Sequence, residues 1–384
     1  MNAHAKSKIQ PETLNHRSAE IVLKLAALRK ILNDHHCQAL RLCGSDWFSW
    51  VTGGGSNVVL MTSETGIAEV LITENRALIL TTQIETLRLS EEEISNDFEI
   101  LVGPWHDGSG FERLVEGECH DGARIMSDRP DGRRNYTAIT PELGDLKLQM
   151  QPEEIERYRA LGRQSAEAMT EALAKAQPDW TENRLAGEGA RALWERGIHP
   201  ALILVAGERR AEIHRHPFPT EARLGGRAFM VFCARRHGLF ANLTRFVSFR
   251  SPTQNEMDRM QAVARIEASA FTASRPGRFL HDIYFDIKKA YVENGRGEES
   301  ERQHFGGVTG YLSREAFARP LAQNEKPLLL KSSMALAWNP TLPGSKNEDT
   351  ILINSQDVEV LTVDPQWPTF TIDGRKRPAV LERS

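Results

Sequence analysis

The chain has 384 residues, of which 40% are hydrophobic and 26% charged, and its net charge is −4 at pH 7, values typical of a soluble globular protein. A chain of this length exceeds the usual size of a single hydrophobic core, so two domains are expected. The slightly acidic balance and the scattered arginine pairs exclude the concentrated basic surface of a nucleic-acid-binding protein.

No segment of the sequence predicts secretion or membrane insertion. Residues 1–20 lack the apolar core of a signal peptide, and no apolar stretch approaches the roughly 20 residues that span a bilayer. The four cysteines, Cys37, Cys43, Cys119 and Cys233, form neither a CxxC pair nor a zinc-binding spacing. This favours a reducing compartment. We therefore expect a cytoplasmic protein without membrane or nucleic-acid partners.

The first part of the chain predicts an α/β domain over residues 1–149. Apolar residues at helical spacing predict a helix over 17–36. Short apolar runs and a turn at Glu74-Asn75 predict strands and a hairpin, and the expected strands cover 39–44, 46–55, 57–62 and 68–82. Trp47 and Trp50 are expected to pack against the sheet, although they could also cap a partner's pocket. An amphipathic segment over 92–103 completes the domain.

A strong helix start marks the second domain, which we expect over residues 150–384. Pro152 is followed by two glutamates, which combines proline in the first turn with acids at the positive end of the helix dipole. This helix is expected to reach about Lys175, and the next, over 182–197, to end at Gly197 in a left-handed cap. The later predicted elements are strands at 201–207, 227–236 and 239–249, helices at 253–273 and 281–295, and a strand-rich end at 327–341 and 348–362.

Five fragments stand in a characteristic order along the sequence. They are GSDWFSWVTGG; PEEIERYRALGRQSAEAM with TENRLAGEGARALWERG; HPFPTEARLGGRAFMVFC with the hairpin CARRHGLFANLTRF; HFGGVTGYLSREA; and SSMALAWNPTLPG with NEDTILINSQDVEVLT. Together they resemble the creatinase/aminopeptidase P branch of the M24 family over nearly the whole chain. The resemblance implies an α/β (α+β) protein with a small α/β N-terminal domain and a C-terminal pita-bread domain, in which helices back a curved antiparallel sheet. It also implies a homodimer.

The resemblance places the family's five metal ligands on mostly neutral side chains. The two Asp positions fall on Cys233 and Asn242, the His on Gln303 with His304 as a one-residue alternative, and the two Glu on Asn339 and Glu348. Neutral amides and a thiol cannot offset the charge of two dications. We therefore expect neither a metal nor another cofactor. A single metal on Cys233, His304 and Glu348 stays as an alternative.

His216 is the candidate catalyst. The stretch HRHPFPTEARL resembles a creatinase segment in which a His before Pro-x-Thr transfers the proton. An imidazole with a pKa of about 6.5 can accept and donate a proton near neutrality, and Pro217 and Pro219 stiffen the segment. The alternative is a structural His at the edge of a strand.

The remaining candidate residues are assigned to substrate binding, apart from one acid. Glu348 is expected to be either a general base or a buried carboxylate paired with Arg245. Arg235 in the hairpin is a candidate anion clamp, with a solvated turn or a subunit contact as the alternative. Tyr311 either lines the pocket or packs in the core. The full set of expected substrate contacts is Asn242, Thr244, Arg245, Gln303, His304, Tyr311, Arg314, Asn339 and Arg235.

These residues predict a metal-independent hydrolase that acts on a C–N bond, of amide or amidine type, in a small polar compound. His216 would serve as its general acid and base. Two alternatives stay open: a non-catalytic M24-like binding protein, and a degenerate metallo-aminopeptidase or Xaa-Pro peptidase. The polar side chains at the replaced positions favour catalysis over binding alone, because a decayed site is expected to fill with apolar residues.

Overall fold

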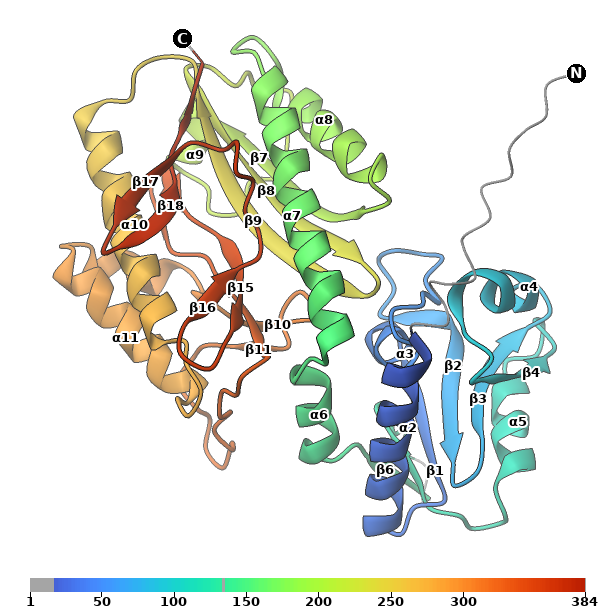
Figure 1. The fold of residues 1–384 in the computed structure, drawn as a ribbon. Helices are drawn as coiled ribbons and strands as arrows, with labels where there is room; N and C mark the ends of the chain where they lie inside the picture. Colours follow the sequence, from blue (N-terminus) through green and yellow to red (C-terminus); the bar gives the residue numbers. More distant parts are fainter. Residues whose placement is uncertain (1–16, 133–134, 384) are drawn as a thin grey trace, which may run out of the picture. The chain divides into compact units, whose positions relative to one another are not determined.

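The computed structural model describes residues 17–132 and 135–383. The chain divides into two compact units, Met1–Lys147 and Leu148–Ser384 (Figure 1). The N-terminal stretch examined for a targeting signal lies almost wholly outside the described residues. Within the described ranges, no helix is long and apolar enough to cross a membrane.

The first unit is built on a six-stranded mixed sheet with the order β4-β3-β2-β1-β5-β6. Its strands are β1 (Ala39–Gly44), β2 (Thr65–Thr73), β3 (Ala77–Thr82), β4 (Glu99–Gly103), β5 (Ile125–Ser127) and β6 (Tyr136–Ala138). Its helices are α2 (Arg17–Asp34), α3 (Ser45–Val51), α4 (Thr86–Arg88), the π-helix η1 (Leu89–Glu93), α5 (Gly110–Glu118) and α6 (Pro141–Leu148), the last of which ends at the boundary of the unit. The expected α/β class is confirmed, as is the hairpin of β2 and β3.

Two of the strands predicted in this unit are wrong. Residues 46–55 were expected to be extended, but α3 occupies most of this range and all seven of its residues are buried. A segment buried on every side shows no period-2 pattern, so hydrophobicity alone does not separate strand from helix. Trp47 and Trp50 are one helical turn apart and meet edge to face, with centroids 5.7 Å apart. Residues 57–62 form no strand, and the side chains of Val59 and Leu60 in this range are 62% and 67% exposed.

The second unit contains two sheets with helices packed on each, and both are antiparallel apart from the short edge strand β19 (Leu381–Glu382), which pairs in parallel with β9 (Leu239–Ser248). The four-stranded sheet has the order β19-β9-β8-β7 and the five-stranded sheet the order β11-β10-β12-β15-β16. A backbone bridge between Thr244 and Glu348 joins the two sheets. Helices α7 and α8 pack on β7–β9, and α10 and α11 pack near the other sheet (Figure 1). The predicted curved antiparallel sheet backed by helices is therefore confirmed.

The elements of the second unit have the following bounds. The helices are α7 (Pro152–Lys175), α8 (Glu182–Trp194), α9 (Glu208–Ala211), α10 (Gln254–Ala273), α11 (Leu280–Glu293) and the 3-10 helix η2 (Gly297–Arg302). The strands of the two sheets are β7 (His199–Gly207), β8 (Arg227–Arg236), β9 (Leu239–Ser248), β10 (Gly306–Thr309), β11 (Ala316–Phe317), β12 (Ala335–Trp338), β15 (Asp349–Ile353), β16 (Val358–Val360) and β19 (Leu381–Glu382). Two small hairpins pair β13 (Thr341–Leu342) with β14 (Ser345–Lys346), and β17 (Thr369–Ile372) with β18 (Arg375–Pro378).

Capping residues explain why the helices begin and end where the sequence predicts. Thr253 and Glu256 form a reciprocal capping box at the start of α10. The side chain of Thr181 accepts a hydrogen bond from the N–H of Arg184 at the start of α8. Gly197 follows α8 with φ +65°, a left-handed conformation that glycine adopts without steric penalty.

The hairpin of β8 and β9 fixes the register of the candidate site. His237 and Gly238 both have positive φ, 52° and 78°, and link the paired residues Arg236 and Leu239. Such a two-residue turn matches the right-handed twist of the strands. The register places Cys233 directly opposite Asn242.

Candidate functional site

A buried carboxylate held by cations forms the centre of the site. Glu348 is 2% exposed, and its two oxygens accept from Arg314 at 3.0 Å, Lys346 at 3.1 Å and the Thr244 hydroxyl at 3.0 Å. Burial alone would raise the pKa of Glu348, but Lys346 and Arg314 outweigh it and lower the pKa to about 2. Glu348 is therefore an ionised carboxylate at neutral pH.

Two imidazoles lie next to this carboxylate. The rings of His216 and His304 stack with their centroids 5.7 Å apart and their planes at 18°. Burial lowers the pKa of His304 to about 4, and Arg314 adds to the effect. Partial burial also lowers the pKa of His216, and the charge of Lys346 adds to the effect. The rest of the His216 side chain is exposed to solvent. Both rings are neutral at pH 7, so His216 can accept a proton.

Amide oxygens without partners line the same side of the sheets. Asn242 lies two residues before Thr244 on β9, so the two side chains share a face. Asn339 follows Trp338, which pairs with Asp349, so Asn339 lies across from Glu348. Among the described residues, no hydrogen-bond partner reaches Asn242 Oδ1, Asn339 Oδ1 or His304 Nδ1, and all three atoms are buried. Buried polar atoms are usually satisfied, so this set indicates where a ligand or water binds.

Several residues expected at the site have other partners. The Gln303 amide donates to the hydroxyl of Tyr291 and, at 3.1 Å, to the carbonyl of Thr341. His304, the one-residue alternative, is the side chain that faces His216. Tyr311 is buried, and its hydroxyl donates to Glu154 Oε1 at 2.6 Å. Tyr311 therefore packs in the core.

Arg245 and Arg235 make contacts that the sequence did not predict. Arg245 does not pair with the Glu348 carboxylate: it donates to Asp349 Oδ1 at 2.7 Å, and to the backbone oxygens of Thr244 and Glu348. Successive residues of an extended chain point to opposite faces, which separates the side chain of Glu348 from that of its neighbour Asp349. The Arg235 guanidinium lies over the ring of Phe240, 5.5 Å from its centroid.

Lys346 is the site residue that the sequence analysis missed. It stands two residues before Glu348, and alternate residues of an extended segment share a face. Its side chain is 4% exposed. The signal available in the sequence was a Lys-x-Glu pair inside a segment otherwise expected to be buried, because a buried lysine is rare unless it is paired.

The side chains of this cluster do not fit a metal pair. Both oxygens of Glu348 already contact cationic side chains. Burial raises the pKa of the Cys233 thiol to about 12, so it is protonated and a poor ligand. Asn242 and Asn339 are neutral and offer no charge against a dication. Across residues 17–132 and 135–383, no group of three or more His, Cys, Asp or Glu side chains is arranged to hold a metal ion.

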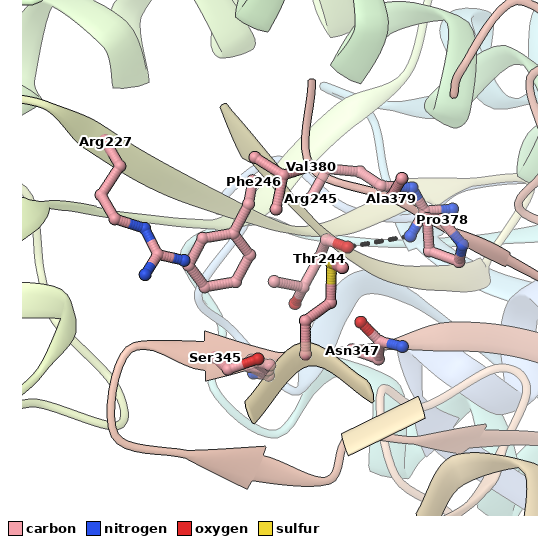
Figure 2. A pocket seen from close by; sticks show the side chains of 11 residues that line it. Arg227, Thr244, Arg245, Phe246, Ser345, Asn347, Pro378, Ala379 and Val380 are labelled. Carbon is pink, nitrogen blue, oxygen red and sulfur yellow. Dashed lines mark hydrogen bonds between the residues drawn. The ribbon is translucent and has the colours of Figure 1, made fainter. Parts of the chain in front are cut away.

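A small cavity shares Thr244 and Lys346 with the cluster (Figure 2). It is also lined by Arg227, Phe246 and the segment 378–380, and its volume of about 20 Å³ has room for roughly one water molecule. Figure 2 shows the Thr244 carbonyl accepting a hydrogen bond from Arg245 at its edge. The cavity is too small for a substrate, and His216, next to the cluster, is exposed to solvent.

Comparison with known proteins identifies the fold and its family. A family model described as metallopeptidase family M24 matches residues 156–355, and no curated protein sequence matches. X-Pro aminopeptidase from Thermotoga maritima is 17% identical, with 94% of this chain and 99% of that chain covered and a TM-score of 0.73. Dipeptidase PepE from Mycobacterium ulcerans is 16% identical, with 95% and 98% covered and a TM-score of 0.72. The N-terminal domain of FACT complex subunit SPT16 from Cicer arietinum is 11% identical, with 90% and 95% covered and a TM-score of 0.67. At these identities the three structures show the shared fold.

Proposed function

This chain belongs to metallopeptidase family M24, whose model matches just over half of its length. We propose that it is a hydrolase of the creatinase/aminopeptidase P group that works without a metal. Its reaction is the hydrolysis of a C–N bond, of amide or amidine type, in a small polar compound. One observation carries the proposal: the Glu348 carboxylate is held by Arg314 and Lys346, two cations that the chain itself supplies.

The neutral imidazole of His216 supplies the acid–base chemistry in this proposal. His216 accepts a proton from water as the water oxygen bonds to the substrate carbon, which gives a tetrahedral intermediate. The intermediate collapses as the C–N bond breaks, and the imidazolium of His216 returns the proton to the leaving nitrogen. The fixed charges of Arg314 and Lys346 stabilise the negative charge that develops on the substrate oxygen or nitrogen.

The test is a turnover screen of small amides, amidines and dipeptides with purified protein, with and without a chelator. We expect turnover that the chelator leaves unchanged, because no step uses a metal. His216→Ala should lower kcat at least 100-fold with an unchanged circular dichroism spectrum. The matched control is His214→Ala, since His214 is also exposed and stands two residues away.

Other outcomes would assign the alternative functions. Turnover that requires an added divalent metal, together with one tightly held ion per chain, would overturn the proposal in favour of a metallopeptidase. Ligand binding without turnover of any compound would identify a binding protein. Full activity of His216→Ala would remove His216 from its catalytic role.

A further inference from the structure

A second cavity, of about 80 Å³, adjoins the small cavity of Figure 2. The two cavities are adjacent because they share the lining residues Arg227, Met260, Ala379 and Val380. The rest of the larger cavity is lined by Ser248, Pro252, Glu256, Met257 and Glu382, none of which contributes to the site around Glu348. Since roughly 10–15 Å³ admits one water molecule, the larger cavity has room for a ligand of about five non-hydrogen atoms.

The guanidinium of Arg227, which lines both cavities, leaves most of its donors unused. Its side chain is 6% exposed, and among the described residues it donates one hydrogen bond, from Nη1 to Glu256 Oε1 at 2.8 Å. Figure 2 shows it beside the ring of Phe246. Arginine carries five N–H donors. Arg245, whose side chain is also 6% exposed, donates to Asp349 and to the carbonyls of Thr244, Glu348 and Thr362. Two equally buried arginines therefore differ in how far the chain satisfies them.

The charges beside the larger cavity are balanced without a ligand. Glu256 pairs with both Arg227 and Arg250, and Arg250 also pairs with Glu208 at 2.6 Å. Two arginines thus face two glutamates, and the exposed Glu382 adds a negative charge at the cavity. An anionic ligand is disfavoured by this excess. The unused donors of Arg227 are therefore satisfied best by a neutral acceptor.

Apolar side chains form much of the remaining lining. Met257 and Met260 stand about one turn apart on α10, and Val380 packs against the core cluster that contains Phe246. All three lining residues are half-buried. Methionine is flexible and polarizable, so it adjusts to ligands of different shape. An aliphatic group can pack here while an acceptor on the same molecule reaches Arg227.

From these observations we propose that the cavity beside Arg227 binds a small neutral aliphatic molecule that carries a carbonyl oxygen. The carbonyl accepts hydrogen bonds from the Arg227 guanidinium, and the aliphatic part packs on Met257, Met260 and Val380. This site is separate from the residues that carry the proposed hydrolysis. Its occupancy is therefore measured without turnover, and its failure would leave the proposed function untouched.

Methionine methyl groups report on this cavity in the full chain. We would label them with ¹³C, assign the signals of Met257 and Met260 from the variants Met257→Leu and Met260→Leu, and titrate by NMR. Three probes of equal size separate the requirements at pH 7: butan-2-one is neutral with a carbonyl, propanoate is an anion and 2-aminobutane is a cation. We expect butan-2-one to shift both signals saturably, at least 10-fold more tightly than either charged probe, and to leave the buried Met169 unchanged.

Two results of the titration would overturn the proposal. One is a shift that rises linearly without saturating, which would mean that the cavity holds water alone. The other is equal or tighter binding of propanoate or 2-aminobutane, which would mean that the cavity does not select a neutral molecule.

Variants place the binding at Arg227. Arg227→Met removes the donors and should weaken butan-2-one binding at least 10-fold. The matched control is Arg259→Met, which removes an arginine of α10 that pairs with Glu212 and does not line the cavity, and which should leave the affinity unchanged. Ala379→Leu fills the space with Arg227 in place and should abolish the shift, so the proposal stays testable if Arg227→Met folds poorly. Unchanged affinity in Ala379→Leu, or in a folded Arg227→Met, would contradict the proposal.

Discussion

Two buried charge clusters lie next to each other in the second unit, and they differ in how their charges balance. In the first, Glu348 faces Arg314 and Lys346. In the second, the carboxylates of Asp349 and Glu267 are paired with two arginines, Arg245 and Arg377.

The second cluster is a structural tie between distant segments. Arg377 comes from β18 and reaches Glu267 on α10 and Asp349 on β15, and its guanidinium lies 4.7 Å from the centroid of Phe271. Asn347 donates to Glu267 at 3.1 Å, so the cluster also holds the segment that carries Glu348. Two carboxyl groups face two guanidinium groups, so the cluster is balanced in number, while burial raises the pKa of Glu267 against the opposing effect of Arg377. One buried cluster thus contains as many carboxyl groups as cations and ties distant segments together, whereas its neighbour holds two cations around one carboxylate.

The largest expected effect breaks the balanced cluster. Arg377→Met leaves Glu267 and one side of Asp349 without a cation, and removing one partner of a buried pair costs about 3–5 kcal/mol in the free energy of unfolding. Urea unfolding followed by circular dichroism measures the change. The control is Arg375→Met, which removes an ion pair with the exposed Asp357 and should cost less than about 1 kcal/mol. A loss below 1 kcal/mol in Arg377→Met would refute the structural role.

Acidification is expected to act on the unbalanced cluster. The folded pKa of His304, about 4, lies below its ordinary value of 6.5, so the folded state favours the neutral ring. This stability is present above pH 6.5 and is lost as the pH falls from 6.5 to 4, up to about 3 kcal/mol in the free energy of unfolding. Glu348, with a folded pKa of about 2, adds a loss in the same direction below pH 4.5.

The variant His304→Gln tests which group is responsible. The loss between pH 6.5 and 4 should shrink to the part that His216 contributes, whose pKa burial also lowers, and the loss below pH 4.5 should stay, because Glu348 is still present. Urea unfolding of the wild type and of His304→Gln at pH 7, 6.5, 5 and 3.5 measures both losses. The same loss between pH 6.5 and 5 in His304→Gln as in the wild type would assign that window to another group.

The smallest loss of stability is expected when Lys346 is removed from the cluster around Glu348. Lys346→Met should cost only about 1–2 kcal/mol in the free energy of unfolding, because Arg314 and the Thr244 hydroxyl still compensate Glu348. The excess positive charge disappears at the same time, which offsets part of the loss. Urea unfolding beside Arg377→Met makes the comparison direct, and equal losses in the two variants would contradict the difference between the clusters.

The sequence predicted those elements whose signals are local. Capping residues and left-handed glycines mark helix ends wherever they occur, so α7, α8 and α10 could be placed from Pro152, Thr181 and Thr253. The hairpin of β8 and β9 was likewise predicted from its strands and its turn. The helix α3 could not be recognised, because its residues are buried on all sides and leave no periodicity to read.

The fold class, the M24 family and most residues of the candidate site could be predicted from the sequence alone, but Lys346 could not. Only the tertiary structure decided which of those residues meet. His304 and not Gln303 faces His216, Arg245 pairs with Asp349, and Lys346 joins Arg314 on Glu348. The physical reason is that one residue of register turns a side chain to the opposite face of a strand. Charge balance also depends on side chains from β9, β14 and the loop after β10, which meet only in the folded chain.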